Sequence, residues 1–228
     1  MAKFSSVNRR GFLKQTAAAA AAPLIVPGAA LGLGGAVPPS DRITLAGIGM
    51  GQRNRNNLGK FLEEKDVQDV ANCDCFADRR ELSKQMVDET YGNTDCASYR
   101  FHEEVLDRSD IDAVLIGTGD RWHALMSMLA ARAGKDVYCE KPFSMTIGEG
   151  RALVETTKRY GTIWQCGTQR KSNPGYKFLV DVVQSGRVGK VHTVTTSFGP
   201  DAGWLATARP KPQPAPDPNV FDYDRWLG

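Results

Sequence analysis

The chain has 228 residues, of which 41% are hydrophobic and 24% charged, as in an ordinary soluble globular protein. Its formal net charge of +3 comes from the first 36 residues, which contain no acid and four cations: Lys3, Arg9, Arg10 and Lys14. The remainder is close to neutral and has no basic stripe interleaved with aromatic residues, so no nucleic-acid partner is expected.

The opening segment has the layout of an export signal. Adjacent arginines in NRRGFLKQ (8–15) precede an alanine-rich, weakly apolar stretch that ends in small residues. The alternative, a membrane anchor, fits less well because Pro23 and Pro27 interrupt the apolar run. We therefore expect residues 1–36 to be a twin-arginine signal for export to the periplasm or another exported location, with no stable membrane span.

After a Pro/Ser linker, strand-like and helix-like segments alternate. Strands are predicted before the glycines of GIGMG and then at 67–76, 111–119, 136–142 and 162–169. Helices are predicted after GIGMG and then at 78–92, 121–135 and 147–161, with Asp78 as a cap and Gly92 as a stop. This alternation predicts an α/β fold, a doubly wound parallel Rossmann sheet over residues 40–169. Right-handed crossovers place the carboxyl ends of all strands on one rim, where ligands bind.

From about residue 170 the pattern changes. One more helix is predicted within 172–190, followed by an alternating strand of an open sheet at 191–198. A proline-rich loop then leads to FDYDRWLG (221–228). Because a single strand does not form a folded unit by itself, we interpret 170–228 as a linker helix and the incomplete start of an α+β substrate domain. The chain is accordingly interpreted as a fragment.

The five cysteines do not form a disulfide framework, because their number is odd and their spacing is unpaired. Cys73 and Cys75 are two residues apart, but two thiolates alone do not make a metal site, and no metal is predicted. All five are expected to be small buried residues in or beside strands.

A glycine-rich turn, GIGMGQ (47–52), connects the first strand to a helix. Gly47 and Gly49 permit a tight turn and let backbone amides approach a pyrophosphate at the helix N-terminus. The third position of the usual pattern is Gln52, with the glycine displaced to Gly51. A turn of this composition also occurs without any ligand, so the motif is a weak signal alone.

Asp74 strengthens that signal because it ends the next strand. There a carboxylate accepts hydrogen bonds from the adenosine ribose hydroxyls of a dinucleotide. Cys75, rather than an arginine, follows it and favours NAD over NADP, while Arg79 and Arg80 keep NADP as an alternative. Without a ligand, Asp74 would be a helix-capping or turn aspartate.

Two residues on the same rim carry candidate chemistry. His123, in TGDRWH, begins a helix, although a lone histidine is more often structural. Lys141, in YCEKPF (138–143), follows a strand and is directed by Pro142, whose bond can be cis. An ammonium beside a nicotinamide can hydrogen-bond a substrate hydroxyl and help its proton leave as hydride departs. The alternative for Lys141 is a surface lysine.

Taken in order, GIGMG, CD, TGDRWH, YCEKP and GTQRKS resemble the Gfo/Idh/MocA (glucose–fructose oxidoreductase / inositol dehydrogenase) family, from about residue 41 onward. The resemblance implies an NAD(P)-binding Rossmann domain and an open-sheet domain for a sugar or polyol, through which members commonly form homo-oligomers. It implies these contacts: Gly47, Gly49 and Gly51 with the pyrophosphate, Asp74 with the ribose, Thr118 and His123 with the nicotinamide side, Glu140 and Lys141 with nicotinamide and substrate, and Gln169 capping the cofactor pocket.

The chain departs from the family pattern at two points. Gly119 stands where the family usually has proline, and the family's second-domain histidine would lie beyond residue 228. We therefore expect an NAD(P)-dependent oxidoreductase that removes hydride from a sugar or polyol, with this chain alone inactive. The alternatives are an NAD-dependent glycosidase that uses transient oxidation and a non-catalytic dinucleotide-binding module.

Overall fold

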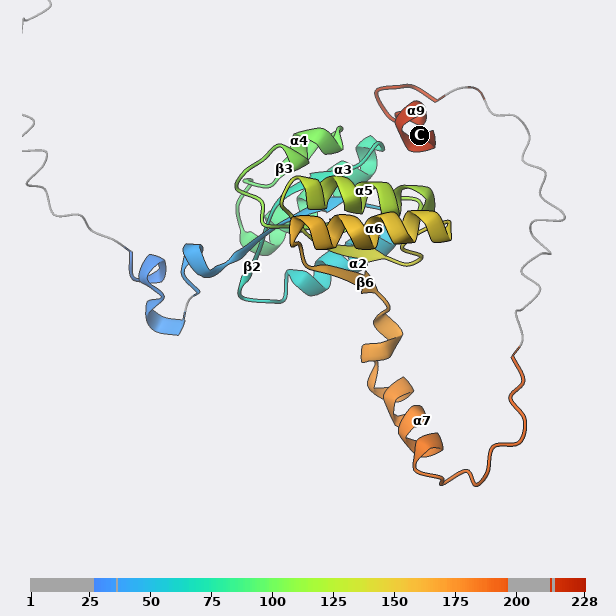
Figure 1. Ribbon diagram of the computed structural model, residues 1–228. Coiled ribbons are helices and arrows are strands. Elements are labelled where there is room, and N and C mark those ends of the chain that lie inside the picture. The colour runs from blue at the N-terminus through green and yellow to red at the C-terminus, as the bar shows by residue number, and fades with distance from the viewer. Residues whose placement is uncertain (1–26, 36, 197–213, 215) are drawn as a thin grey trace, which may run out of the picture. The chain divides into compact units, whose positions relative to one another are not determined.

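The computed structural model describes residues 27–35, 37–196, 214 and 216–228 (Figure 1). The chain divides into two compact units, Met1–Arg42 and Ile43–Gly228. In the first unit the described residues form three short 3₁₀ turns: Gly28–Leu31, Leu33–Gly35 and Pro39–Asp41. The arginine pair and the apolar stretch to Val26 of the expected export signal lie outside the described residues.

The second unit contains a six-stranded sheet in the order β3-β2-β1-β4-β5-β6. Its neighbouring strands all pair in parallel, which confirms the doubly wound Rossmann prediction. The strands are β1 (Ile43–Ile48), β2 (Val67–Cys73), β3 (Ala97–Tyr99), β4 (Ala113–Ile116), β5 (Asp136–Glu140) and β6 (Trp164–Gly167).

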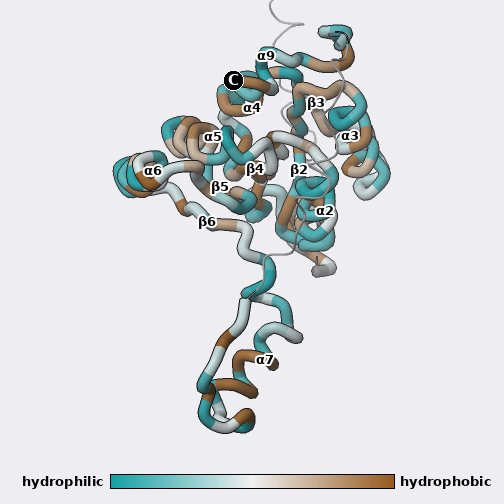
Figure 2. Tube along the Cα trace, turned by 90° about the vertical axis from the view of Figure 1, so that its right-hand side faces the viewer, coloured by the Kyte–Doolittle hydropathy of each residue, from teal (hydrophilic) through white to brown (hydrophobic). Residues whose placement is uncertain are grey.

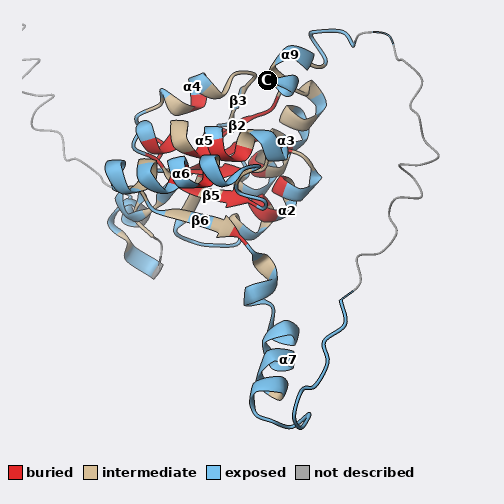
Figure 3. Ribbon diagram, turned by 45° about the vertical axis from the view of Figure 1, so that its right-hand side comes forward, coloured by how far each residue is buried: buried red, intermediate tan, exposed pale blue. Residues whose placement is uncertain are grey.

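Helices cover both faces of this sheet, because successive side chains of a strand point to opposite faces. Ile48 of β1 belongs to a buried cluster with Met126, on the face covered by α4 and α5. Leu45 of the same strand packs with Leu58 on the other face, which α2 and α3 cover. Figure 3 shows the buried residues concentrated in the strands and on the inward helix faces. The helices are α2 (Gln52–Phe61), α3 (Ala77–Tyr91), α4 (His102–Leu106), α5 (Asp120–Arg132) and α6 (Ile147–Tyr160).

The ends of α3 illustrate where local sequence patterns succeed and fail. Gly92 adopts the left-handed conformation, with φ 68°, and ends the helix as predicted. Asp78 is not the cap: the N-cap position is Phe76, without a side-chain hydrogen bond, and Asp78 lies in the first turn. There its negative charge still faces the positive end of the helix dipole.

Beyond β6 the chain forms η4 (Gln169–Ser172), α7 (Pro174–Gln184) and α9 (Tyr223–Leu227). α7 has no buried residue, and Figure 2 shows hydrophobic positions along it. The strand predicted at 191–198 is not formed over its described part, residues 191–196. Among the described residues, no strand pairs with this segment, and a strand needs a hydrogen-bonded neighbour to form.

Two further observations concern the described residues as a set. None of their helices combines the length and apolar character needed to cross a membrane. Their five cysteines are all free thiols, with Cys73, Cys96 and Cys139 buried and Cys75 and Cys166 partly exposed.

Candidate functional site

Glycine is required at two of the three predicted positions, at Gly47 inside β1 and at Gly49 in the turn that follows it. A Cβ on Gly47 would lie 2.3 Å from the Asn72 Oδ1 atom. Gly49 has φ 77°, and its Cβ would lie 2.6 Å from the Thr118 backbone nitrogen. Gly49 therefore packs closely against the tip of β4, whereas Gly47 is buried beneath the Asn72 and Met50 side chains and not open to a pyrophosphate.

Gly51 has a different role, because it is the N-cap of α2. It offers no side-chain oxygen to the first-turn amides of the helix. A Cβ there would meet only the end of the Arg79 side chain, at 3.8 Å. The exposed amides and the open space beside them are the features with which helix N-termini bind phosphate groups.

Asp74 holds this turn against the tip of β2. Its Oδ2 atom accepts a hydrogen bond from the Met50 amide at 2.6 Å, and its Oδ1 atom accepts one from the Phe76 amide at 2.9 Å. The side chain is 5% exposed, and burial raises its pKa, while these amides and the nearby Arg79 guanidinium act in the opposite direction. Each carboxylate oxygen retains capacity for a further donor, such as a ribose hydroxyl.

A cavity of about 260 Å³ opens beside this carboxylate. It brings together three predicted site residues, Gly49, Asp74 and Thr118, from the tips of β1, β2 and β4. This volume lies below the roughly 300–1,000 Å³ of typical small-molecule pockets, so the cavity matches one half of a dinucleotide rather than the whole. The roles of its residues toward a cofactor remain predictions.

Glu140, at the tip of β5, is held by a network that the sequence did not reveal. Its Oε1 atom accepts hydrogen bonds from Arg53 Nε and Asn57 Nδ2, each at 2.8 Å, and also from Gln169 Nε2. The residue is 4% exposed. Burial alone would raise the pKa of Glu140, but the hydrogen bonds from Asn57 and Arg53 outweigh it and leave the pKa below its ordinary value.

This network changes the expected positions of two residues. Glu140 was expected to reach the nicotinamide and substrate, but its carboxylate is directed into the protein and joins β5 to α2. Gln169 was expected to cap the cofactor pocket, but it donates to Glu140 and to the Tyr138 hydroxyl and is absent from the lining of the cavity. Arg53 and Asn57 were missed, although their i,i+4 spacing places them on one helix face.

Lys141 differs from its neighbour because its side chain is exposed. Its ammonium makes no ion pair or hydrogen bond with any other described residue. The following Lys141–Pro142 peptide bond is cis, as the sequence suggested. The β5 tip therefore combines a held carboxylate with a free cation.

His123 lies near the start of α5 at the rim, as expected, but its side chain is buried. It is 1% exposed, with Nδ1 2.6 Å from the Pro142 carbonyl oxygen and Nε2 3.2 Å from that of Thr118. Both neighbours are carbonyl oxygens, which accept, so a ring nitrogen that carries a proton can donate to the carbonyl beside it. The ring connects the tips of β4 and β5, which fits the structural alternative, and its contact with a nicotinamide stays a prediction.

No group of three or more His, Cys, Asp or Glu side chains that could hold a metal ion occurs in the described ranges. The candidate site therefore consists of a glycine turn, a buried aspartate with its cavity, and the Glu140–Lys141 tip, all at the carboxyl edge of the parallel strands.

Comparison with known proteins gives this arrangement a context. Residues 42–168 match the model of a family described as an oxidoreductase family with an NAD-binding Rossmann fold. Myo-inositol 2-dehydrogenase of Thermotoga maritima is 30% identical over 131 residues, which cover 58% of this chain and 35% of that protein. A glycosyl hydrolase family 109 protein of Shewanella pealeana is 30% identical over 206 residues, which cover 81% and 44%.

A solved structure supports the same comparison. The crystal structure of myo-inositol 2-dehydrogenase from Lactobacillus plantarum has a TM-score of 0.58 and 25% sequence identity, and the match covers 66% of this chain and 43% of that one. This chain thus spans less than half the length of the relatives that it matches.

Proposed function

This chain belongs to the Gfo/Idh/MocA family of NAD-binding oxidoreductases, and we propose that it serves an NAD(P)-dependent enzyme that oxidises a hydroxyl of a sugar or polyol. The observation that carries the proposal is the free ammonium of Lys141 on the same sheet edge as the glycine turn and Asp74. The inositol dehydrogenases among its relatives support the choice of a polyol.

The residues present fit a dinucleotide along this edge. The cavity beside Asp74 would take the adenosine half, with the carboxylate accepting from ribose hydroxyls. The uncapped amides of α2 and the open backbone of Gly51 would hold the pyrophosphate. The β5 tip would then adjoin the nicotinamide half, and bound NAD⁺ would supply the hydride acceptor.

Lys141 would act as the general base toward the reacting hydroxyl. In its neutral amine form, the Nζ atom would accept the proton of the substrate hydroxyl and become an ammonium, as the C–H bond breaks and its electron pair leaves with the hydride. Glu140 and His123 would position this lysine, because Glu140 Oε2 accepts from the Lys141 amide at 3.1 Å and His123 contacts the Pro142 carbonyl. Neither side chain is exposed enough to take part in the chemistry itself.

The first experiment is to identify any nucleotide that remains on protein purified without added cofactor, by mass spectrometry, and to titrate the protein with NAD⁺ and NADP⁺. We expect dinucleotide binding, and a chain that binds neither would contradict the proposal. Incubation with myo-inositol and simple sugars then tests for net NADH formation. In protein that also carries a substrate domain, cleavage of glycosides without net NADH would point to the glycosidase, and binding without any conversion to a non-catalytic module.

We expect the 228-residue chain alone to bind dinucleotide with little turnover, because it matches less than half of its relatives' length. A turnover rate in the ordinary enzymatic range of about 1–1,000 s⁻¹ would contradict this expectation.

We also propose that residues 1–36 direct export through the twin-arginine route. The support is the Arg9–Arg10 pair, followed by a weakly apolar stretch. A fusion of this segment to a folded reporter protein should reach the periplasm. Replacing both arginines by lysine should retain the reporter in the cytoplasm, and unchanged export would refute the proposal.

A further inference from the structure

The cavity beside Asp74 has one wall that comes from a distant part of the sequence. Arg225 and Trp226 line it together with residues of the Rossmann strand tips. They belong to the segment of residues 216–228, which contains α9 and lies outside the family match at residues 42–168.

Segment 216–228 is attached to the β2 tip by backbone and ring contacts. The Ala77 amide donates to the Val220 carbonyl at 2.9 Å, and the Asp222 amide donates to the Cys75 carbonyl at 3.0 Å. The rings of Phe76 and Phe221 stack with centroids 3.8 Å apart. The segment is therefore held directly beside Asp74, the residue between Cys73 and Cys75.

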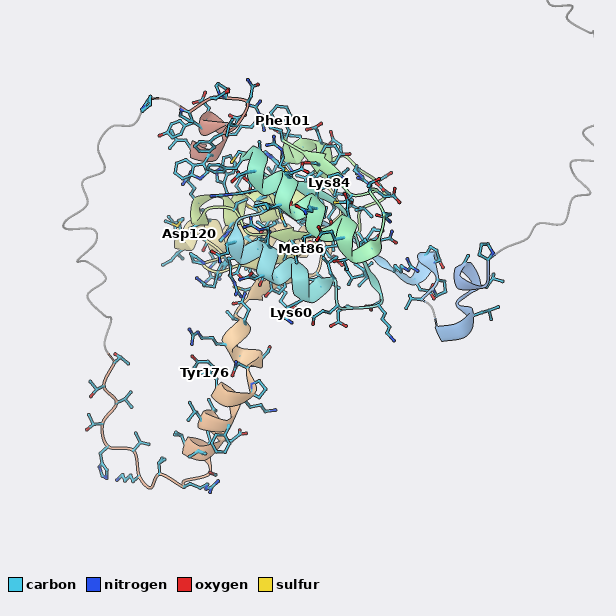
Figure 4. The ribbon with its side chains drawn as sticks, turned by 180° about the vertical axis from the view of Figure 1, so that it is seen from behind. Lys60, Lys84, Met86, Phe101, Asp120 and Tyr176 are labelled. Atoms are coloured by element: carbon cyan, nitrogen blue, oxygen red, sulfur yellow. The ribbon has the colours of Figure 1, made fainter. Side chains whose placement is uncertain are left out.

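Two ion pairs attach the same segment to the neighbouring β3–α4 connection and to the first turn of α4. Asp222 pairs with Arg100 at 2.7 Å, and Arg225 pairs with Glu103 at 2.9 Å. The Arg225 guanidinium also lies 4.2 Å from the centre of the Phe101 ring, and Figure 4 shows Phe101 next to α9. Because Arg225 is already engaged, its stem rather than its charge is available to the cavity.

A third set of contacts reaches the start of α5. Arg121 stacks on the Trp226 ring at 4.4 Å from its centre and donates from Nε to the Leu227 carbonyl at 2.8 Å. Trp122 donates from its indole nitrogen to the Trp226 carbonyl at 3.2 Å. The segment thus spans from the β2 tip to the β4–α5 connection, across the mouth of the cavity.

The orientation of Trp226 is fixed by its surroundings. Phe221 and Tyr223 each lie 5.9 Å from its ring, in addition to Arg121, and the side chain is 37% exposed. Trp122, whose indole nitrogen donates to the Trp226 carbonyl, lines the same cavity. Two indole rings beside a carboxylate suit a purine nucleoside, because aromatic rings stack on bases while the carboxylate accepts from the ribose hydroxyls.

We propose that segment 216–228 forms the outer wall of the adenosine site and that Trp226 is a specificity-determining contact for the adenine base. This inference rests on the proposed dinucleotide-binding function and extends it to a residue that the Rossmann motif does not contain. A wall held in place before binding reduces the ordering cost of binding, so its contribution appears as affinity.

The test compares affinities of the 228-residue protein and its variants for NAD⁺ and AMP, by calorimetric titration. Trp226→Ala should weaken binding of both ligands about tenfold, within the 1–3 kcal/mol that stacking on one base contributes. Trp226→Phe, which keeps an aromatic face, should stay within about threefold of the wild type. Leu227→Ala is the matched control, since Leu227 is 49% exposed and does not line the cavity.

The outcomes separate this inference from the proposed function. If the wild type binds neither ligand, the proposed function fails. If the wild type binds both and Trp226→Ala binds equally well, the wall role alone is refuted. Tighter binding by Trp226→Ala would also refute it, because the segment would then compete with the nucleotide. Thermal unfolding of each variant checks that a lost affinity does not reflect a lost fold.

Discussion

Two buried carboxylates at the sheet edge have pKa values shifted in opposite directions. At the β2 tip, Asp74 is buried among backbone amides beside a cavity, and its pKa is raised, chiefly by burial. At the β5 tip, burial also opposes ionisation of Glu140, but cationic and amide side chains more than offset it, and its pKa is lowered. In our proposal the first carboxylate receives a ligand, whereas the second positions its neighbour, Lys141.

The largest effect should come from Lys141→Ala in protein that reduces NAD⁺ with a polyol. We expect turnover to fall roughly 100- to 10,000-fold, the usual contribution of general acid–base catalysis. NAD⁺ affinity should change only a few fold, because the lysine acts on substrate. Lys177→Ala on α7 is the control for loss of an exposed lysine. A large loss of NAD⁺ affinity would instead assign Lys141 to cofactor binding.

Glu140→Ala should have the next largest effect, on stability. This substitution removes the shared acceptor of Arg53, Asn57 and Gln169. It also creates a cavity at the β5 tip. We expect unfolding free energy to fall by about 2–4 kcal/mol, because each hydrogen bond to a charged group contributes about 1.5–3 kcal/mol and the partners are partly re-solvated. Urea denaturation measures this, with Glu140→Gln as the isosteric comparison. A loss below about 0.5 kcal/mol, the level of an ordinary surface substitution, would show that the network is not structural.

Acid dependence should distinguish the same two carboxylates by sign. Glu140 has a lowered pKa in the fold, so its contribution is complete above its unfolded value of about 4.3 and is lost as pH falls through the folded value. Asp74 has a raised pKa, so the cost of burying its charge disappears as pH falls through that value. Between about pH 7 and about pH 3, Glu140→Gln should therefore lose less stability than the wild type and Asp74→Asn should lose more. Shifts of equal sign in urea unfolding would contradict the assignment.

Asp74→Ala should weaken NAD⁺ binding by roughly 10- to 100-fold, the equivalent of one charged hydrogen bond and some loosening of the glycine turn. The Met50 amide would lose its partner at the same time, so the variant also tests the turn. Asp74→Asn keeps one acceptor oxygen and should show a smaller loss. Unchanged NAD⁺ affinity in Asp74→Ala would return this residue to a purely structural role in the turn.

The difference between the two tips also explains how much the sequence could predict. The apolar runs of the strands and the glycines at their ends are local signals, and they predicted the parallel sheet and the position of Asp74. β3 and α4 were missed because three and five residues are too short to show a period. The partners of Glu140 lie 87 and 83 residues earlier, at Arg53 and Asn57, so no local sequence pattern predicts these contacts.

The burial of His123 and the approach of Trp226 were inaccessible for the same reason. The contacts of His123 are with backbone carbonyls that the fold brings to it. Every residue has such a carbonyl, so the sequence does not indicate which ones a histidine contacts. Trp226 reaches Trp122 across 104 positions. A pattern therefore predicted which residues stand at the rim but not which way their side chains turn.

The smallest predicted effect concerns the choice between NAD and NADP, at the two arginines that follow Asp74. Arg80 donates from Nη1 to the Asp74 carbonyl at 2.7 Å and is therefore engaged in the fold. Arg79 lies 3.9 Å from the centre of the Phe76 ring, lines the cavity, and forms no ion pair with another described residue. Arg79 is thus the cation that could meet a 2′-phosphate, because a stacked guanidinium keeps its donors available.

Arg79→Ala should therefore weaken NADP⁺ binding about threefold to tenfold and change NAD⁺ binding less than twofold, as expected for one exposed phosphate contact of about 1 kcal/mol. Arg151→Ala, an exposed position on α6, controls for the change in net charge. Equal losses for both cofactors would place Arg79 at the shared pyrophosphate, near Gly51, where its guanidinium also reaches. In that case Asp74 alone would select the ribose, and the β2 tip would favour NAD because a buried carboxylate repels the extra phosphate.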